Sequence, residues 1–296
     1  AASTAGSDRV ADTKHDALGA RISFGHPDVL RLVGAGDAEY MSRENSPPLG
    51  IRSRLGIARW YDHMDHTLHV MMDRSMWFAP IYETISTDHF APLVSHDPRL
   101  RGRERELEEP VRFACGYAQT VFLCTAVEVF FIWHFGASVA FFIDTGRGTL
   151  SDLSAVRTWV ESRKEYKSWD SWQELTPAKR FRSLTALSFA DLKNAESFFS
   201  DIYGSDCLKR ALPAEYTKLG TVYQALQSER NGIVHRGGEH KSGRRIEVPR
   251  SALRDRHAQG KWLGARLLRM SSWFRGFWLD GNAYGILTHR GHTNPN

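Results

Sequence analysis

An arginine, an asparagine and a histidine lie close together in the segment SERNGIVHRGG, residues 228–238. The guanidinium of Arg230 can bind two phosphate oxygens at once, and the imidazole of His235 can gain or lose a proton near neutral pH. The amide of Asn231 both donates and accepts hydrogen bonds, so it can orient the histidine or a phosphate oxygen. These groups suit the attack of an RNA 2′-hydroxyl on the adjacent phosphorus without a metal ion, because histidine moves a proton and arginine stabilises the phosphoryl charge.

An amphipathic helix is expected to carry this segment. Its apolar stripe steps by three, four, three and seven residues through Tyr216, Leu219, Tyr223, Leu226 and Ile233. Arg230 occupies the position that would continue the stripe, and a charge there must be paired or face a cleft. Asn231 and His235 are four residues apart, so they project from one face, and the long side chain of Arg230 can reach the same spot. Gly237 and Gly238 are expected to end the helix.

The same pattern also fits a hydrogen-bond network at a helix end with no catalytic role. In that interpretation Arg230 pairs with Glu229 or Glu128, and His235 is a satisfied core histidine near a helix C-terminus. Spacing alone favours this structural interpretation over the catalytic one.

The RN-x3-H pattern of residues 230–235 resembles the R-x4-6-H motif of the HEPN superfamily (higher eukaryotes and prokaryotes nucleotide-binding domains). ESFFSDIYG at 196–204, a linker and the helix ending in RNGIVHRGG look like the last two core helices of HEPN domains from bacterial defence and toxin systems. TAVEVFF at 125–131 resembles an earlier core helix in which an acidic residue often occurs. The resemblance covers residues 111–240 and, less closely, the rest of the chain.

The resemblance implies an all-α helical bundle that commonly dimerises, so that two motifs meet in a composite cleft. Many HEPN domains are metal-independent endoribonucleases that leave a 2′,3′-cyclic phosphate and a 5′-hydroxyl. Carried over, Arg230 and His235 would be catalytic, Asn231 would assist, and Glu128 and Glu229 would support them, with Glu128 a candidate partner of Arg230. The alternative is a catalytically silent HEPN-like module that binds RNA or a partner protein.

The resemblance further implies a toxin or antiphage effector that acts on RNA as a homodimer. Such an activity would need an antitoxin or another regulatory protein to restrain it. No cofactor and no metal are expected.

The C-terminal part of the chain is basic. The whole chain has a net charge of +5, whereas residues 241–296 hold eleven Lys/Arg and three Asp/Glu. A basic excess of this size permits a polyanionic partner such as RNA. Next to the motif helix we expect RNA contacts from Arg236, Lys241, Arg244 and Arg245. The aromatic residues of the same region are expected to lie in the core rather than to stack on bases.

A histidine-rich segment offers candidate metal ligands. His63, His66 and His69 are interspersed with aspartates, which suits zinc and related ions. However, positions 63 and 69 are about 240° apart around a regular helix, so the three imidazoles cannot face one ion. We therefore expect a polar helix face and no metal site.

One stretch, residues 120–143, is long and apolar enough to cross a membrane. Glu128 and His134 lie within it and no second such stretch accompanies it, which favours a buried core helix or two short helices that meet near Gly136. The three cysteines form no CxxC pair and indicate reduced thiols, so we expect a cytoplasmic protein.

The chain divides into three zones. Residues 1–50 are expected to form a flexible leader and linker, and residues 51–110 an N-terminal helical extension. Residues 111–296 are expected to form the HEPN-like helical domain. The charged run 99–110 predicts a solvated helix or connector that stops at Pro110.

Overall fold

The computed structural model describes residues 54–101, 103–189 and 191–280, and these residues are the basis of every structural statement below. The expected flexible leader, residues 1–50, lies outside them. The described residues form helices and no β-strand, which confirms the predicted all-α class. In chain order the elements are α2 (Arg54–Met76), α3 (Phe78–Ile85), a π-helical turn (Ser86–Phe90), α4 (Ala91–His96), a 3-10 turn (Pro98–Leu100), α5 (Glu104–Asp144), a 3-10 turn (Leu150–Asp152), α6 (Ser154–Glu161), α7 (Trp169–Gln173), α8 (Pro177–Leu184), α9 (Leu192–Tyr203), α10 (Cys207–Ala211), α11 (Tyr216–Arg236) and α12 (Arg250–Asp280).

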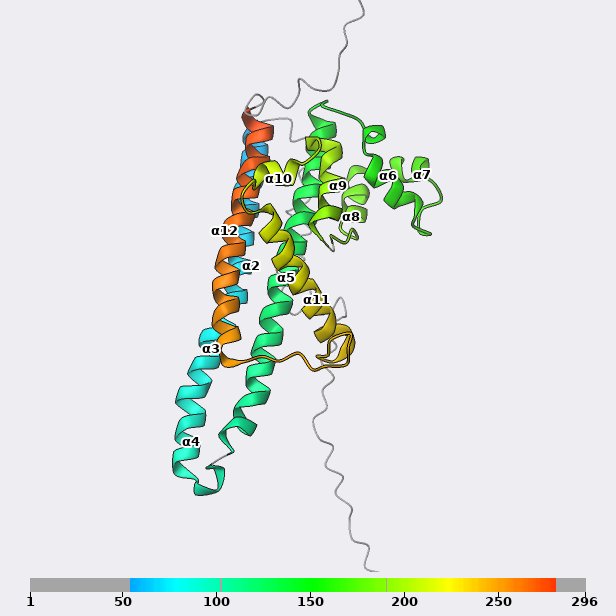
Figure 1. Ribbon diagram of the computed structural model, residues 1–296. Helices are drawn as coiled ribbons and strands as arrows, with labels where there is room; N and C mark the ends of the chain where they lie inside the picture. The colour runs from blue at the N-terminus through cyan, green and yellow to red at the C-terminus, as the bar shows by residue number, and fades with distance from the viewer. Residues whose placement is uncertain (1–53, 102, 190, 281–296) are drawn as a thin grey trace, which may run out of the picture.

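Four long helices, α2, α5, α11 and α12, form the body of the protein, and the short helices α6 to α9 cover one side of it (Figure 1). α2 is antiparallel to α12, because Asp62 bonds Arg275 while the imidazole of His257 lies 3.2 Å from the carbonyl oxygen of Met76. α5 has 41 residues and is therefore about 60 Å long. α11 lies antiparallel along α5 and so places its C-terminal end beside the first half of that helix.

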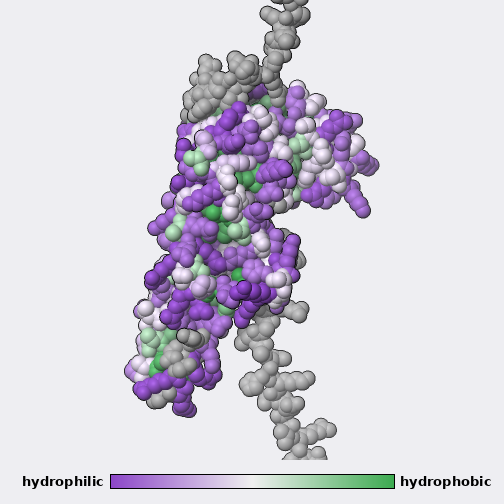
Figure 2. All heavy atoms as spheres, in the orientation of Figure 1, coloured by the Kyte–Doolittle hydropathy of each residue, from purple (hydrophilic) through white to green (hydrophobic). Residues whose placement is uncertain are grey.

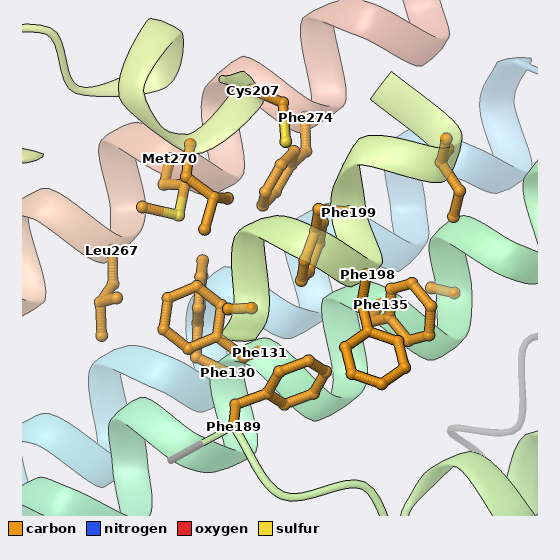
Figure 3. Packing of buried hydrophobic residues seen from close by; sticks show 14 of the residues in the cluster. Phe130, Phe131, Phe135, Phe189, Phe198, Phe199, Cys207, Leu267, Met270 and Phe274 are labelled. Carbon is orange, nitrogen blue, oxygen red and sulfur yellow. The ribbon is translucent and has the colours of Figure 1, made fainter. Parts of the chain in front are cut away.

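Aromatic side chains form the core around the second half of α5. Phe131 and Phe135 of α5 point toward Phe199 of α9, which stacks on Phe274 of α12 at 5.0 Å between ring centroids (Figure 3). Trp273 is also buried here. Phe277 and Trp278 are buried as well, so the prediction that the C-terminal aromatic residues lie in the core is confirmed for these four, whereas Trp262 is only half-buried against the core.

α5 is one continuous helix rather than two helices that meet at Gly136. A Cβ on Gly136 would lie 2.7 Å from Cε2 of Phe181, so the glycine lets α8 approach closely instead of breaking the helix. Of the described helices, α5 alone is long and apolar enough to cross a membrane, and 67% of its apolar window is buried inside the protein. A core helix of a soluble protein passes the same test, so the membrane alternative gains only weak support.

α2 packs into the same core as α5 and α12. Trp60, Met64 and Leu68 are buried in one continuous apolar cluster with residues of those helices, and Met71 is half-buried against it. The predicted domain boundary at residue 110 falls inside α5. The prediction that Pro110 ends a helix is wrong, because α5 begins at Glu104 and continues through the proline. Proline removes one backbone N–H near the start of a helix that has many other hydrogen bonds.

Candidate functional site

The RN-x3-H motif lies on the last two turns of α11, as the apolar stripe predicted. Leu219, Tyr223, Leu226 and Ile233 are buried on the inner face of this helix. The helix ends at Arg236, Gly237 adopts the left-handed conformation with φ of 63°, and the N–H of Gly238 donates to the carbonyl of residue 232 at 3.0 Å. The prediction of a glycine-terminated helix is confirmed.

Arg230 is paired inside the chain and still reaches solvent. Its Nη1 lies 3.6 Å from Oε2 of Glu128 on α5 and donates to Oε1 of Gln227 at 3.3 Å. The side chain of Arg230 is 29% exposed and that of Glu128 is 17% exposed. The expected contact between Glu128 and Arg230 is present, and an arginine on the apolar stripe is thereby compensated.

A chain of hydrogen bonds fixes the two partners of Arg230. Gln227 donates through Nε2 to the hydroxyl of Tyr223 at 2.8 Å, and this hydroxyl donates to the carbonyl of Phe189 at 2.6 Å. Ser188 donates to Oε1 of Glu128 at 3.5 Å. Gln227 and Ser188 therefore belong to the site although the sequence did not single them out. Gln227 could have been found, since it precedes Arg230 by three residues and shares its helix face.

Cys124 lies near the same ion pair, but its thiol is unreactive. Burial raises the pKa of its thiol to about 12, the charge of Glu128 acts in the same direction, and Arg230 opposes them. The thiol is therefore protonated at neutral pH and is no nucleophile.

His235 and Asn231 occupy a different side of the helix end. His235 is exposed and Asn231 is half-buried, and neither has a hydrogen-bond or ion-pair partner among the residues described. The expected convergence with Arg230 on one spot is not seen. Arg230 turns toward α5 because Glu128 and Gln227 hold it there, and five residues separate it from His235, about 140° around the helix. The interpretation of His235 as a core histidine is wrong as well, since its side chain faces solvent.

A tight loop, residues 237–249, folds back over the end of α11. The N–H of His240 donates to the carbonyl of Arg244 at 2.8 Å, and the N–H of Ile246 donates to the carbonyl of residue 238 at 2.7 Å. A Cβ on Gly232 would lie 2.5 Å from Cδ1 of Ile246 and 2.7 Å from the carbonyl oxygen of Glu239. Gly232 therefore permits close packing of the loop on the helix.

The last residue of α11 and the loop that follows it carry the basic residues expected to contact RNA. Lys241 is exposed and has no partner among the described residues. Arg236 is half-buried and donates through Nε to the carbonyl of Glu239 at 2.9 Å. Both remain candidates for phosphate contacts.

Arg244 and Arg245 are exposed but already have acidic neighbours. Arg244 lies 3.1 Å from Glu247, and Arg245 lies 3.7 Å from Glu109 with its guanidinium 4.2 Å from the ring centroid of Phe113. Exposed ion pairs of this kind are worth at most about 1 kcal/mol, so a phosphate can replace the carboxylate.

Much of the C-terminal positive charge is used within the chain. Arginines of α12 pair with acidic side chains on other elements. The pairs are Arg250–Glu108, Arg254–Glu83, Arg256–Glu229, Arg266–Glu215, Arg269–Glu215 and Arg275–Asp62. Glu229, predicted to support the motif, therefore bonds Arg256 rather than Arg230. No sequence signal could have indicated this partner, which lies 27 residues away on another helix.

The histidine-rich segment lies on α2 and gathers no metal ligands. Within the described ranges, no three His, Cys, Asp or Glu side chains are grouped so that they could hold an ion. Asp62 pairs with Arg275, and Asp65 accepts a hydrogen bond from Ser271. These aspartates thus help to join α2 to α12.

Comparison with known proteins finds no matching family model, curated protein or solved structure. The functional interpretation therefore depends on the residues of the site and on the resemblance of its motif.

Proposed function

We propose that the protein is a metal-independent endoribonuclease of the HEPN type, acting in the cytoplasm as a toxin or antiphage effector under the control of an antitoxin or other regulatory protein. Arg230 and His235 are its catalytic residues and Asn231 assists them. One observation carries the proposal: the last two turns of α11 hold an exposed imidazole and an arginine that is fixed by Glu128 and Gln227 yet remains accessible.

The chemistry needs only a proton carrier and a cation. His235 takes the proton of the 2′-hydroxyl, the 2′-oxygen forms a bond to phosphorus, and the bond from phosphorus to the 5′-oxygen breaks. The leaving 5′-oxygen gains a proton, so the products are a 2′,3′-cyclic phosphate and a 5′-hydroxyl. Arg230 faces Glu128 in the structure, so it exchanges this contact for the phosphate in order to stabilise the charge that develops on the phosphoryl oxygens. The basic loop, through Lys241 and its neighbours, holds the RNA backbone.

A homodimer would supply the second proton carrier. The outer face of α11 carries four exposed side chains without charge, Thr221, Gln224, Ala225 and Ser228. A second copy packed across this face near Ser228 would bring two helix ends together, so that the histidine of one copy protonates the leaving group while the other accepts the first proton.

The test is cleavage of total RNA in EDTA, with identification of the product ends. Wild-type protein should cleave and leave cyclic phosphates, whereas Arg230→Ala and His235→Ala should each lose at least about a hundredfold in rate. His69→Ala is the matched control, because His69 is an exposed histidine of α2, outside the motif and the basic loop. Absence of cleavage by the wild type, or wild-type rates in both motif variants, would contradict the proposal.

The second candidate is a catalytically silent module that binds RNA or a protein. The internal ion pair of Arg230 with Glu128 favours it, since that contact gives the arginine a structural role without any substrate. This candidate predicts salt-dependent RNA binding by the wild type with no cleavage.

A further inference from the structure

Arg256 of α12 contacts the turn of α11 that carries the motif. Its Nη2 bonds Oε1 of Glu229, the residue before Arg230, and its Nη1 donates to the carbonyl oxygen of Gly116 in α5 at 3.3 Å. One guanidinium therefore joins the three helices α5, α11 and α12 next to the motif.

This ion pair differs from its neighbour on α12 in its burial. The side chain of Arg256 is 11% exposed and that of Glu229 is 20% exposed, whereas Arg254, two residues nearer the start of α12, is 78% exposed in its pair with Glu83. Removing a charge from water is costly, and a buried pair is retained only with good geometry and further hydrogen bonds. The bond to Gly116 supplies such a further contact.

The sequence makes room for this guanidinium. A Cβ on Gly116 would lie 2.9 Å from Nη1 of Arg256 and 2.5 Å from Cγ1 of Val248. Any larger residue at position 116 would push Arg256 away from Glu229 or displace the segment that leads into α12. The glycine therefore belongs to the same arrangement.

Two ion pairs on adjacent residues fix the rotation of α11 about its axis. Glu229 is held toward α12 by Arg256, and Arg230, about 100° further around the helix, is held toward α5 by Glu128. With these two directions set, His235 must point away from both neighbouring helices. Its exposure agrees with this geometry.

We infer that Arg256 is a positioning residue of the candidate ribonuclease site: by holding Glu229 it fixes the last turns of α11, and with them the places of Arg230 and His235 relative to the RNA. The catalytic part of this inference rests on the proposed function. The part that concerns the order of the helix end does not.

The first experiment compares Arg256→Met and Arg256→Lys with the control Arg254→Met by steady-state RNA cleavage. Arg256→Met should lower kcat by about tenfold to a hundredfold with KM changed by less than about threefold, because a small misplacement of catalytic groups affects the transition state most. Arg256→Lys, which keeps the charge near Glu229, should recover most of the lost kcat. Arg254→Met should behave as wild type. A loss of folded protein would also lower the apparent kcat without changing KM, so kcat is calculated per folded molecule, with the folded fraction of each variant measured by circular dichroism. The tenfold to hundredfold loss should remain after this correction.

The second experiment needs no RNA and separates this inference from the proposed function. Backbone amides of residues 230–236 should exchange hydrogen at least about tenfold faster in Arg256→Met than in wild type and Arg254→Met. If Arg256→Met does not fold, two other proteins take its place: Arg256→Lys, and the double variant Arg256→Glu, Glu229→Arg, in which the two charges are swapped. The amides of residues 230–236 should exchange no faster in the double variant than in Arg256→Lys. Unchanged exchange, or an unchanged kcat in a cleaving enzyme, overturns the inference. Absence of cleavage by every protein overturns only the proposed function and the catalytic part, while exchange still decides whether Arg256 orders the helix end.

Discussion

Two histidines of this protein have opposite surroundings and different chemical capacity. His235 is exposed at the end of α11, whereas His134 is fully buried in α5 with Phe130 at 4.2 Å and Trp60 at 5.4 Å between ring centroids. Burial lowers the pKa of His134 to about 3, so that imidazole is neutral over the whole physiological range. Of these two, only His235 is placed to exchange protons with a substrate, and the proposed mechanism uses it alone.

The buried histidine predicts a loss of stability in acid. The unfolded chain restores the pKa of His134 to about 6.5, so protons favour the unfolded state between pH 6.5 and the folded pKa of about 3. The stability that neutral burial provides is present above pH 6.5 and is lost by up to about 1.4 kcal/mol per pH unit below it. In His134→Phe, the free energy of unfolding measured with urea should fall less steeply between about pH 6.5 and 4.5 than in the wild type. His240→Gln, at an exposed site, should lose stability in acid as steeply as the wild type. If His134→Phe also loses stability as steeply as the wild type, the imidazole of His134 is not the cause of the acid sensitivity.

At the scale of the element, α11 contains two glycines with different roles. Gly220 lies in the helix interior, and a Cβ there would make only an ordinary contact of 3.6 Å with Leu192. Gly232 allows the loop of residues 237–249 to approach, because a Cβ there would lie only 2.5 Å from Cδ1 of Ile246. The same substitution should therefore have opposite effects at the two sites.

Gly220→Ala should raise the free energy of unfolding by about 0.5–1 kcal/mol, because alanine favours the helix more than glycine does. Gly232→Ala should lower it by about 1–3 kcal/mol, because the methyl group displaces the loop from the helix. Urea unfolding of both variants measures the difference. Equal effects in the two variants would mean that the loop does not depend on close approach at Gly232.

Local patterns in the sequence predicted the motif helix well. The apolar stripe from Tyr216 to Ile233 and the glycine at 237 depend on helical periodicity and on backbone conformation, both of which act within a few residues. The arginine on that stripe also correctly indicated an internal partner. The prediction that a helix stops at Pro110 was wrong because a proline disturbs only the hydrogen bonds near it. The packing of the whole of α5 against α2, α11 and α12 decides whether the helix forms.

Contacts between distant segments could not be predicted in the same way. Glu229 and Arg256, or Glu128 and Ser188, meet only because the segments pack side by side, and neither pair leaves a pattern in one sequence. The contact of Arg230 with Glu128 was expected, but its consequence was not: the acidic residue on α5 turns the arginine away from His235, so the expected convergence is absent.

At the scale of the whole molecule, the visible surface is mostly hydrophilic (Figure 2). Figure 2 shows polar residues over most of the visible face. The large hydrophobic side chains exposed in the described part of the chain, Trp77, Ile81 and Leu93, lie on or beside α3 and α4. The outer face of α11, with the exposed residues Thr221, Gln224, Ala225 and Ser228, has no large hydrophobic side chain.

The proposed dimer across α11 gives a prediction for this scale. Ala225→Arg places a charge in the middle of the exposed face, and at a two-fold interface each copy would meet the substitution of the other. Two like charges brought together without partners destabilise an interface strongly. Sedimentation at micromolar concentration should therefore show a monomer in place of the wild-type dimer, and RNA cleavage should be lost with it.

Ala91→Arg is the matched control, because Ala91 is an exposed alanine at the start of α4, outside the proposed interface. It should remain dimeric and active. Mixing wild-type with excess His235→Ala protein adds a second criterion: if each cleavage uses the histidines of both copies, heterodimers should be inactive and the wild-type rate should fall as subunits exchange. A monomeric wild type that cleaves RNA would contradict the composite site while leaving Arg230 and His235 as the catalytic pair, so the dimer and the chemistry are tested separately.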